Sequence, residues 1–388
     1  MRRHDFPIFR HNPNLCYLDS AATAQKPDIV LSDMQTFAER YNANVRRGVH
    51  SLSNMADYHY NQAARKAVAD FIGARPHEIV FTQNATAGIN LVARGFVAYR
   101  DYRRHPLILH TKADHNSNIL PWRALPEHTV VAIEPSVSAL HDAFRLEGSR
   151  IALVALPHVS NVLGYEYPIG EMIALAHFHH TPVLIDAAQS IGHTDVNVSR
   201  LGADFLVFSG HKMLGPTGIG VLYVNECWHD QMRPVFWGGG MVDGEAPAKM
   251  PERMEAGTPP IIEAVGLTAA INYIKAIGEY TIASHCVDLA NQCTERLYAL
   301  PGVAVLGPSP KVNLVSFTME GLHPHDVGFE LDHLGIAVRA GHHCAPALHK
   351  ALGISGSIRA SFHVYNTPDD VDRLIEGLAH VRRTFGSV

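Results

Sequence analysis

The chain has 388 residues, of which 47% are hydrophobic and 18% charged, and its formal net charge is −5 with histidine neutral. This balance is ordinary for a globular protein long enough for two domains and a large core. The negative charge disfavours a protein that coats nucleic acid or an anionic membrane, and no apolar run approaches the roughly 20 residues of a membrane span.

Five cysteines are spread along the chain without a CxxC pair: Cys16, Cys227, Cys286, Cys293 and Cys344. Few and scattered cysteines are typical of free thiols in a reducing compartment. Residues 1–7 are basic, but the apolar segment of a secretory signal does not follow them. We therefore expect a soluble, cytoplasmic protein that binds neither nucleic acid nor membrane.

Short β-branched runs alternate with helical patterns from about residue 78 to residue 225. This alternation predicts an α/β domain with a mostly parallel sheet covered by helices on both faces. The predicted strands are residues 78–82, 106–110, 129–133, 151–156, 182–185, 204–208 and 220–224. Helices are predicted at residues 86–96 and 171–180, among others.

Residues 225–262 are rich in glycine and proline, which marks a loop region and a domain boundary. Further elements are predicted as a helical stretch at 262–300, strands at 313–318, 337–339 and 357–362, a helix at 325–334, and a last helix from Thr367. Thr367 is the expected N-cap of that helix, with Pro368 in its first position. We expect a large domain at 15–262 and a small α+β domain at 263–388, on which residues 1–14 pack.

Polar residues follow the carboxyl ends of several predicted strands, where ligands bind in open α/β sheets. They are Thr86, His115, Asn161, Asp186, Gln189, Ser209, His211 and Lys212. A helix N-terminus binds phosphate, a lysine forms a Schiff base with an aldehyde, and a carboxylate pairs with a pyridinium nitrogen. Each residue alone is more often a cap, a turn or a solvated side chain. Their convergence favours a site for a phosphorylated aromatic cofactor.

Seven motifs occur in a fixed order: Arg46–His50, His158–Gly164, Asp186–Gln189, Ser209–Lys212, Glu255–Pro259, Arg339–Ala345 and Arg359–Phe362. With Tyr17–Ala22 and Tyr365–Thr367, they make nearly the whole chain resemble a cysteine desulfurase of the class V aminotransferase family. The resemblance is to the subgroup with the Suf-type desulfurases and selenocysteine lyases. It implies the fold type I of pyridoxal 5'-phosphate (PLP) enzymes, with a mostly parallel seven-stranded sheet.

The resemblance also implies residue roles. Lys212 would hold PLP as a Schiff base and move protons, and Asp186 would keep the pyridine nitrogen protonated. His115, the third expected catalytic residue beside Lys212 and Cys344, would stack on the ring and shuttle protons. The other expected cofactor contacts are Gln189 and Asn161 at the phenolic oxygen, Thr86, Ser209 and His211 at the phosphate, and Thr258 at the phosphate of a partner subunit. Substrate would be bound by Arg359 at its carboxylate and by Asn161 and His50.

Cys344 would attack the sulfur of L-cysteine, leaving L-alanine and a persulfide on Cys344. The flanking Arg339, His342 and His343 favour a thiolate. A small buried hydrophobe is the usual alternative for a free cysteine. A metal site with His349 is a weaker alternative, because a second ligand pair at finger-like spacing is missing from the sequence.

The expected partners are L-cysteine or L-selenocysteine, a second copy of the chain in a homodimer, and a small sulfur-acceptor protein. Iron–sulfur cluster assembly, tRNA thiolation and other pathways are all left open as destinations of the sulfur. Alternatives on the same scaffold are a selenocysteine lyase, an aminotransferase, an epimerase or a kynureninase-like lyase. A non-catalytic scaffold in sulfur trafficking is the alternative from a different class.

Three departures from the family pattern stand out. Asn84-Ala85-Thr86-Ala87 replaces the usual Gly-Thr-Thr-Glu, and Asn116 replaces a second histidine. The stretch at residues 241–254 is shorter than in typical members of the family, where it forms a hairpin that reaches the active site of the neighbouring subunit. We expect the shorter cover to leave Cys344 more open and less dependent on a dedicated acceptor.

Overall fold

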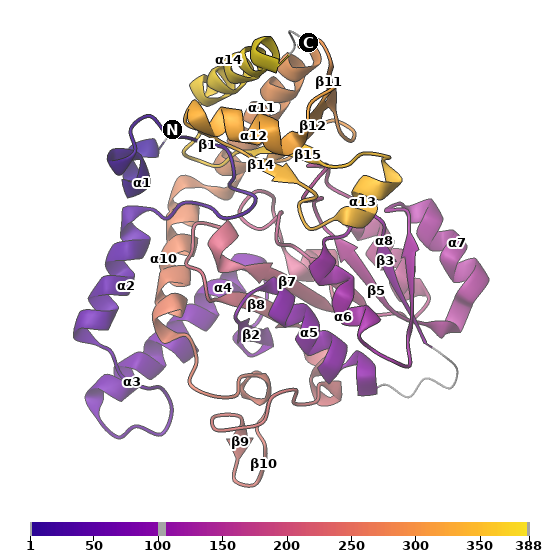
Figure 1. The fold of residues 1–388 in the computed structure, drawn as a ribbon. Coiled ribbons are helices and arrows are strands. Elements are labelled where there is room, and N and C mark those ends of the chain that lie inside the picture. The colour runs from indigo at the N-terminus through magenta and orange to yellow at the C-terminus, as the bar shows by residue number, and fades with distance from the viewer. Residues whose placement is uncertain (1, 100–105, 386–388) are drawn as a thin grey trace.

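A computed structural model of the chain describes residues 2–99 and 106–385. Its centre is a seven-stranded sheet of order β2-β8-β7-β6-β5-β3-β4, in which β8 runs antiparallel to both neighbours and the other pairs are parallel (Figure 1). The strands are β2 (Ile79–Thr82), β3 (Leu107–Thr111), β4 (Thr129–Ile133), β5 (Ile151–Pro157), β6 (Val183–Asp186), β7 (Phe205–Ser209) and β8 (Gly220–Val224). Each lies within one residue of its predicted bounds, so the predicted sheet is confirmed.

Helices cover both faces of this sheet because its strands carry apolar residues on both sides. Leu107 and Leu109 of β3 face one core, and Ile108 between them faces the other. The first core includes residues of α2 (Asp28–Arg40), α4 (Arg65–Ile72), α7 (Val137–Glu147), α8 (Ile169–Phe178) and α10 (Ile261–Ile277). The second includes residues of α5 (Ala85–Gly95) and α6 (Leu120–Arg123). Such two-sided burial is typical of parallel sheets.

A second, antiparallel sheet of order β11-β12-β15-β14 forms the small domain, drawn in orange and yellow in Figure 1. Its elements are β11 (Val303–Val305), β12 (Leu314–Met319), β14 (Arg339–Gly341), β15 (Ser357–Ser361), α11 (Glu279–Tyr298), α12 (Pro324–His333) and α14 (Pro368–Phe385). These helices share a third core with the sheet. The short helix α13 (Pro346–Ala351) follows the segment that carries Cys344.

The helical stretch predicted at 262–300 is two helices, because Gly278 adopts φ +97° between α10 and α11. Apolar residues of α10 lie in the core of the large sheet, whereas those of α11 lie mainly in the core of the small one. The predicted boundary at 262 and 263 thus falls at the start of α10, one helix before the change of core. No single described helix is long and apolar enough to cross a membrane; α10 and α11 pass that test only as a pair bent by 80°.

The N-terminal segment, with α1 (Pro7–His11), contacts both parts of the molecule. Phe6 packs edge-on against Tyr365 with ring centroids 4.8 Å apart, and Arg3 pairs with Asp370 at 3.0 Å. The Tyr273 hydroxyl of α10 donates to Asp5 over 2.7 Å. The segment therefore ties α10 to the start of α14.

The short stretch at 241–254 still folds back on itself. Strands β9 (Val242–Asp243) and β10 (Ala246–Pro247) form a small antiparallel hairpin. Figure 1 shows it projecting from the large domain, at the end of the molecule opposite the small sheet. The shortened stretch thus keeps a hairpin of two-residue strands.

Glu255 is a buried carboxylate where the loop after this hairpin returns to the sheet. Its two oxygens accept both terminal nitrogens of Arg65 at 2.8 and 2.7 Å, and the Phe81 backbone N–H at 2.8 Å. The Tyr60 hydroxyl and an Arg46 terminal nitrogen donate to it at 3.1 Å each. Such a carboxylate is stable in the interior because its charge is paired and its lone pairs are hydrogen-bonded.

We expect Glu255→Gln to lower the free energy of unfolding by about 3–5 kcal/mol, because it leaves the buried Arg65 guanidinium uncompensated. Chemical denaturation measures this loss. Glu226→Gln is the matched control, because Glu226 pairs with Arg75 at the exposed surface and should cost less than about 1 kcal/mol. Equal losses in the two variants would contradict the role given to Glu255.

Candidate active site

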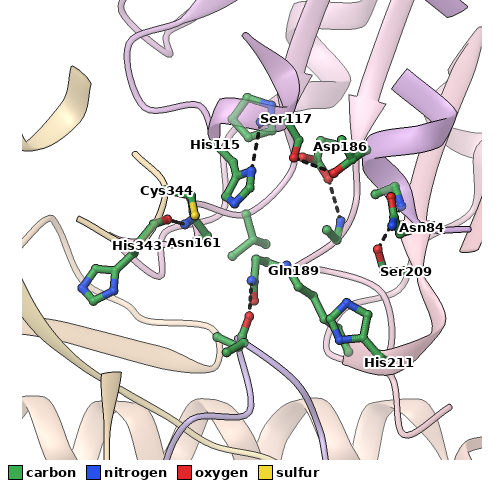
Figure 2. Close-up of a pocket in the computed structure, with 18 of the residues that line it drawn as sticks. Asn84, His115, Ser117, Asn161, Asp186, Gln189, Ser209, His211, His343 and Cys344 are labelled. Carbon is green, nitrogen blue, oxygen red and sulfur yellow. Dashed lines mark hydrogen bonds between the residues drawn. The ribbon is translucent and has the colours of Figure 1, made fainter. Parts of the chain in front are cut away.

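A pocket of about 290 Å³ lies where the carboxyl ends of the large-sheet strands meet the small domain. Ten predicted site residues line it: Thr86, His115, Asn161, Asp186, Gln189, Ser209, His211, Lys212, Cys344 and Arg359. Figure 2 shows Cys344 and Asn161 on one side of the pocket and Asp186 and Ser209 on the other. The volume is near the lower end of the range for small-ligand sites.

Two predicted residues, His50 and Thr258, do not line this pocket. His50 is exposed, and its ring Nδ1 accepts the Ser53 backbone N–H at 3.2 Å, where it caps α3 (Ser51–Asp57). Thr258 lies in a separate surface groove with Tyr60 and Phe236. Within one chain, His50 therefore lies outside this pocket and its ring Nδ1 caps a helix, so the predicted substrate contact stays a prediction.

The N-terminus of α5 forms the end of the pocket suited to phosphate. The Asn84 side chain caps the helix by accepting the Ala87 N–H at 3.0 Å, and the Ala85 N–H donates to Ser209 Oγ at 2.9 Å. A Cβ added to Gly220 of β8 would lie 2.5 Å from Asn84 Cα. Glycine at this position therefore lets the helix start approach the sheet, where its N–H groups are available to an anion.

Ser117 is a site residue that the sequence did not predict. Its hydroxyl lies 2.7 Å from that of Thr86, and it lines the same pocket. The family pattern has a second hydroxyl beside Thr86, where this chain has Ala85. Ser117 supplies a hydroxyl there from a different segment, two residues after His115. Its place two residues after His115 is the only signal in the sequence that points to Ser117.

Lys212 and Asp186 come from neighbouring strands. Asp186 ends β6, and Lys212 ends the turn Gly210–Lys212 that follows β7. Burial lowers the pKa of Lys212 to about 8, although the Asp186 carboxylate acts in the opposite direction. Burial also raises the pKa of Asp186, against the Ala188 N–H that donates to it at 3.0 Å. The amine is therefore closer to its neutral, nucleophilic form than an exposed lysine.

His115 is neutral at physiological pH. Burial lowers its pKa to about 4, and the positive charges of Lys212 and Arg359 act in the same direction. Ring Nδ1 accepts the Ser117 N–H at 3.0 Å, so the neutral ring carries its proton on Nε2. An uncharged, oriented imidazole in the pocket wall is suited to stacking on an aromatic ring.

Hydrogen bonds to backbone carbonyls hold the Cys344 segment in place, and Cys344 is exposed. Asn161 Nδ2 donates to the His343 carbonyl at 2.7 Å, and the Asn116 N–H donates to the Cys344 carbonyl at 2.8 Å. His343 and Cys344 both adopt left-handed backbone angles, with φ 49° and 56°. Asn116 acts through its backbone here, so this contact tolerates the replacement of the family's histidine.

The histidines near Cys344 have other partners. His343 Nε2 and His349 Nε2 both lie 2.9 Å from Ser357 Oγ. Burial lowers the pKa of His343 to about 2, so it contributes no positive charge near neutral pH. Among the described residues, no group of three or more His, Cys, Asp or Glu side chains is arranged to hold a metal ion.

Arg359 of β15 is almost fully buried in the pocket wall. One terminal nitrogen, Nη1, donates to the Asn161 carbonyl at 2.9 Å, and the other, Nη2, lies 3.4 Å from Asp19. Its Nε is buried without a hydrogen-bond partner among the described residues. Arg359 thus lines the pocket with the charge and planar guanidinium that suit a substrate carboxylate.

This donor set fits PLP. The N-terminus of α5 with the hydroxyls of Thr86, Ser117 and Ser209 suits the phosphate. Lys212 suits the aldehyde and Asp186 the pyridine nitrogen. Arg359, which also lines the pocket, suits the carboxylate of an amino acid.

Comparison with known proteins agrees with this geometry. The chain matches the class-V aminotransferase family over residues 16–374. A probable cysteine desulfurase of Halalkalibacterium halodurans is 41% identical over 398 residues, covering 99% of this chain and 98% of the relative. A cysteine desulfurase of Salmonella typhimurium is 41% identical over 400 residues, with the same coverage.

Solved structures give the same result. The apo cysteine desulfurase of Thermococcus onnurineus NA1 has a TM-score of 0.92 and 41% identity, covering 99% of this chain and 98% of that one. An S-sulfonic acid form of an Escherichia coli cysteine desulfurase has a TM-score of 0.90 and 32% identity, with 98% of each chain covered. The chain therefore belongs to the class-V aminotransferase family and, within it, to the cysteine desulfurases.

Proposed function

We propose that this protein converts L-cysteine to L-alanine and passes the sulfur through a persulfide on Cys344 to an acceptor. The observation that carries the proposal is the exposed Cys344 thiol at the wall of a pocket that also holds Lys212, Asp186 and Arg359. A thiol in this place reaches a substrate bound in the pocket and an acceptor outside it.

Each side chain has a task in this reaction. Bound PLP, held by Lys212 and paired with Asp186, supplies the electron sink. Arg359 holds the substrate carboxylate, and the Cys344 thiolate attacks the substrate sulfur. A sulfur–sulfur bond forms as the carbon–sulfur bond breaks, and the carbon keeps the electron pair. That carbon then takes up a proton, for which Lys212, with a pKa of about 8, is the suitable donor.

The alternatives on this scaffold are less favoured. An aminotransferase, an epimerase or a kynureninase-like lyase needs no exposed thiol at position 344. A non-catalytic scaffold needs neither Lys212 nor Asp186 in the pocket. Selenocysteine lyase activity uses the same residues, so it is the second candidate, and turnover of L-selenocysteine beside L-cysteine separates the two.

The protein's partners follow from the same proposal. A persulfide on an exposed cysteine needs an acceptor thiol, so we propose a small sulfur-acceptor protein, with cytoplasmic iron–sulfur cluster assembly as the destination. We also propose a homodimer, in which Thr258 reaches the phosphate site of the other subunit. The exposed positions of Thr258, Val49 and Trp237 support this, since none of them serves the pocket of its own chain.

Cys344→Ser is expected to bind PLP and L-cysteine but to release at least about a hundredfold less sulfide, because the hydroxyl does not accept the sulfur. Sulfide and alanine release with a reducing thiol present measures the effect. Cys227→Ser, which changes an exposed thiol outside the pocket, should leave the rate unchanged. Sulfide release by Cys344→Ser at the wild-type rate would rule out the proposed persulfide.

Lys212→Ala should lose the yellow covalent PLP linkage and at least about a thousandfold of turnover. In the unmodified apoprotein, the rate of covalent PLP capture should rise with pH and level off above about pH 8, because only the neutral amine attacks the aldehyde. Borohydride reduction followed by peptide mapping measures both. A rate that keeps rising to about pH 10, as for an exposed lysine, would contradict the depressed pKa.

Sedimentation velocity is expected to give twice the mass of one chain. Thr258→Val should weaken PLP retention by about 0.5–1.5 kcal/mol, the usual contribution of one hydrogen bond, because its hydroxyl reaches the partner's phosphate site. PLP loss during dialysis measures this, and Thr268→Val, at a helical threonine outside the pocket, is the control. A monomer that stays fully active at high dilution would contradict both statements.

A further inference from the structure

Asp19 belongs to the Tyr17–Ala22 motif, and the proposed reaction gives it no task. Its backbone forms a parallel bridge with Ser361, and the Ser361 N–H donates to the Leu18 carbonyl at 2.8 Å. This pairing holds the N-terminal segment against β15, two residues beyond Arg359. The Asp19 carboxylate therefore lies at the carboxylate end of the pocket although it is 340 positions away in sequence from Arg359.

Two arginines share this carboxylate. Arg339 of β14 and Arg359 of β15 are directly opposite each other in the antiparallel register. Asp19 Oδ1 lies 3.4 Å from Arg359 Nη2, and Asp19 Oδ2 lies 3.6 Å from Arg339 Nη1. Like charges opposite each other on a sheet repel, so Asp19 offsets the repulsion between the two guanidinium groups.

Both contacts are long. Charge-assisted hydrogen bonds between nitrogen and oxygen are usually about 2.7–2.9 Å, so Asp19 acts on both arginines mainly through the attraction of its charge. Nε and Nη2 of an arginine form one edge of its planar fork, which binds a carboxylate through two parallel bonds. In Arg359, Asp19 faces only Nη2 of this edge, and the buried Nε has no partner among the described residues. Asp19 therefore leaves part of the hydrogen-bonding capacity of Arg359 unused.

Charge counting shows what Asp19 changes. Two guanidinium groups and one carboxylate leave a net charge of 2 − 1 = +1 at this end of the pocket. An amino-acid carboxylate neutralises that charge. Without Asp19 the charge would be +2, and any bound carboxylate, including that of the product, would be held more strongly.

We propose that Asp19 is a positioning residue that presets the Arg339–Arg359 pair and limits its charge, so that L-alanine leaves after each turnover. This inference rests on the proposed function and concerns its carboxylate subsite. The attraction that binds the carboxylate of L-cysteine also retains that of L-alanine. Asp19 weakens the binding of both amino acids by a similar factor and thereby favours release of the product.

The test is Asp19→Asn in the PLP-bound protein. The dissociation constant for L-alanine, followed through the cofactor absorbance, should fall about three- to tenfold, which is somewhat more than exposed ion pairs give. KM for L-cysteine and kcat should fall together, because product release becomes slower. Binding of cysteamine, which has the amine and thiol but no carboxylate, should not change.

Two single variants serve as controls. Asp19→Glu keeps the charge and should stay near wild type. Asp195→Asn removes an equivalent charge from an exposed residue outside the pocket and should change nothing. An unchanged or weaker affinity for L-alanine in Asp19→Asn would overturn the inference, as would an equal gain for cysteamine.

A double-mutant cycle with Arg339→Gln covers the case in which Asp19→Asn alone fails to fold. Arg339→Gln should weaken L-alanine binding, and the double variant, with one arginine and no aspartate, should return to the wild-type value. If the double variant binds L-alanine as weakly as Arg339→Gln alone, Asp19 does not act through its charge. These binding measurements need no turnover, so failure of desulfuration and failure of the role of Asp19 can be told apart.

Discussion

The hydrogen bonds of Asn161 hold the two domains together at the active site, and the geometry of the site depends on them. Its side chain donates to the His343 carbonyl at 2.7 Å, and its own carbonyl accepts a terminal nitrogen of Arg359 at 2.9 Å. Asn161, which follows β5, thereby fixes both the Cys344 segment and the substrate-binding arginine. Each partner comes from the small domain, so the large domain alone has no complete site.

The segment after Asn161 is joined to the small domain over its whole length. Ser316 Oγ donates to the Val162 carbonyl at 2.6 Å, the Lys311 amine to the Leu163 carbonyl at 2.8 Å, and the Val312 N–H to the Gly164 carbonyl at 2.8 Å. Satisfying buried carbonyls in this way is obligatory in an interior without water. A short loop therefore acts as a rigid link, which is what a reaction between groups of two domains requires.

Burial governs the electrostatics of the pocket. It lowers the pKa of Lys212, His115 and Arg359 to about 8, about 4 and about 10, and it raises that of Asp186. Each shift disfavours the charged form of the group. The pKa of Lys212 thus lies closer to neutral pH than that of an exposed lysine, and His115 is uncharged at neutral pH. Arg359 keeps its charge because a pKa of about 10 is still well above neutral pH, and Asp19 acts against the effect of burial.

The sequence by itself determined the central sheet and most of the candidate site. Its seven strands are continuous apolar runs, a local pattern that burial on both faces requires. The residues at the strand ends converge because parallel strands present their carboxyl ends at one edge. Ten of the twelve predicted site residues therefore line one pocket, since each lies in a motif or at a strand end.

Only the tertiary structure decided the rest. The helix break at Gly278 and the core to which α10 belongs depend on which apolar surfaces meet, and periodicity does not state this. Ser117 joins Thr86 across 31 positions and Asp19 joins Arg359 across 340. His50 lies in a motif, yet its ring caps a helix in its own chain. Such contacts are set by chain geometry in three dimensions, because the residues that make them carry no local sequence signal of their partners.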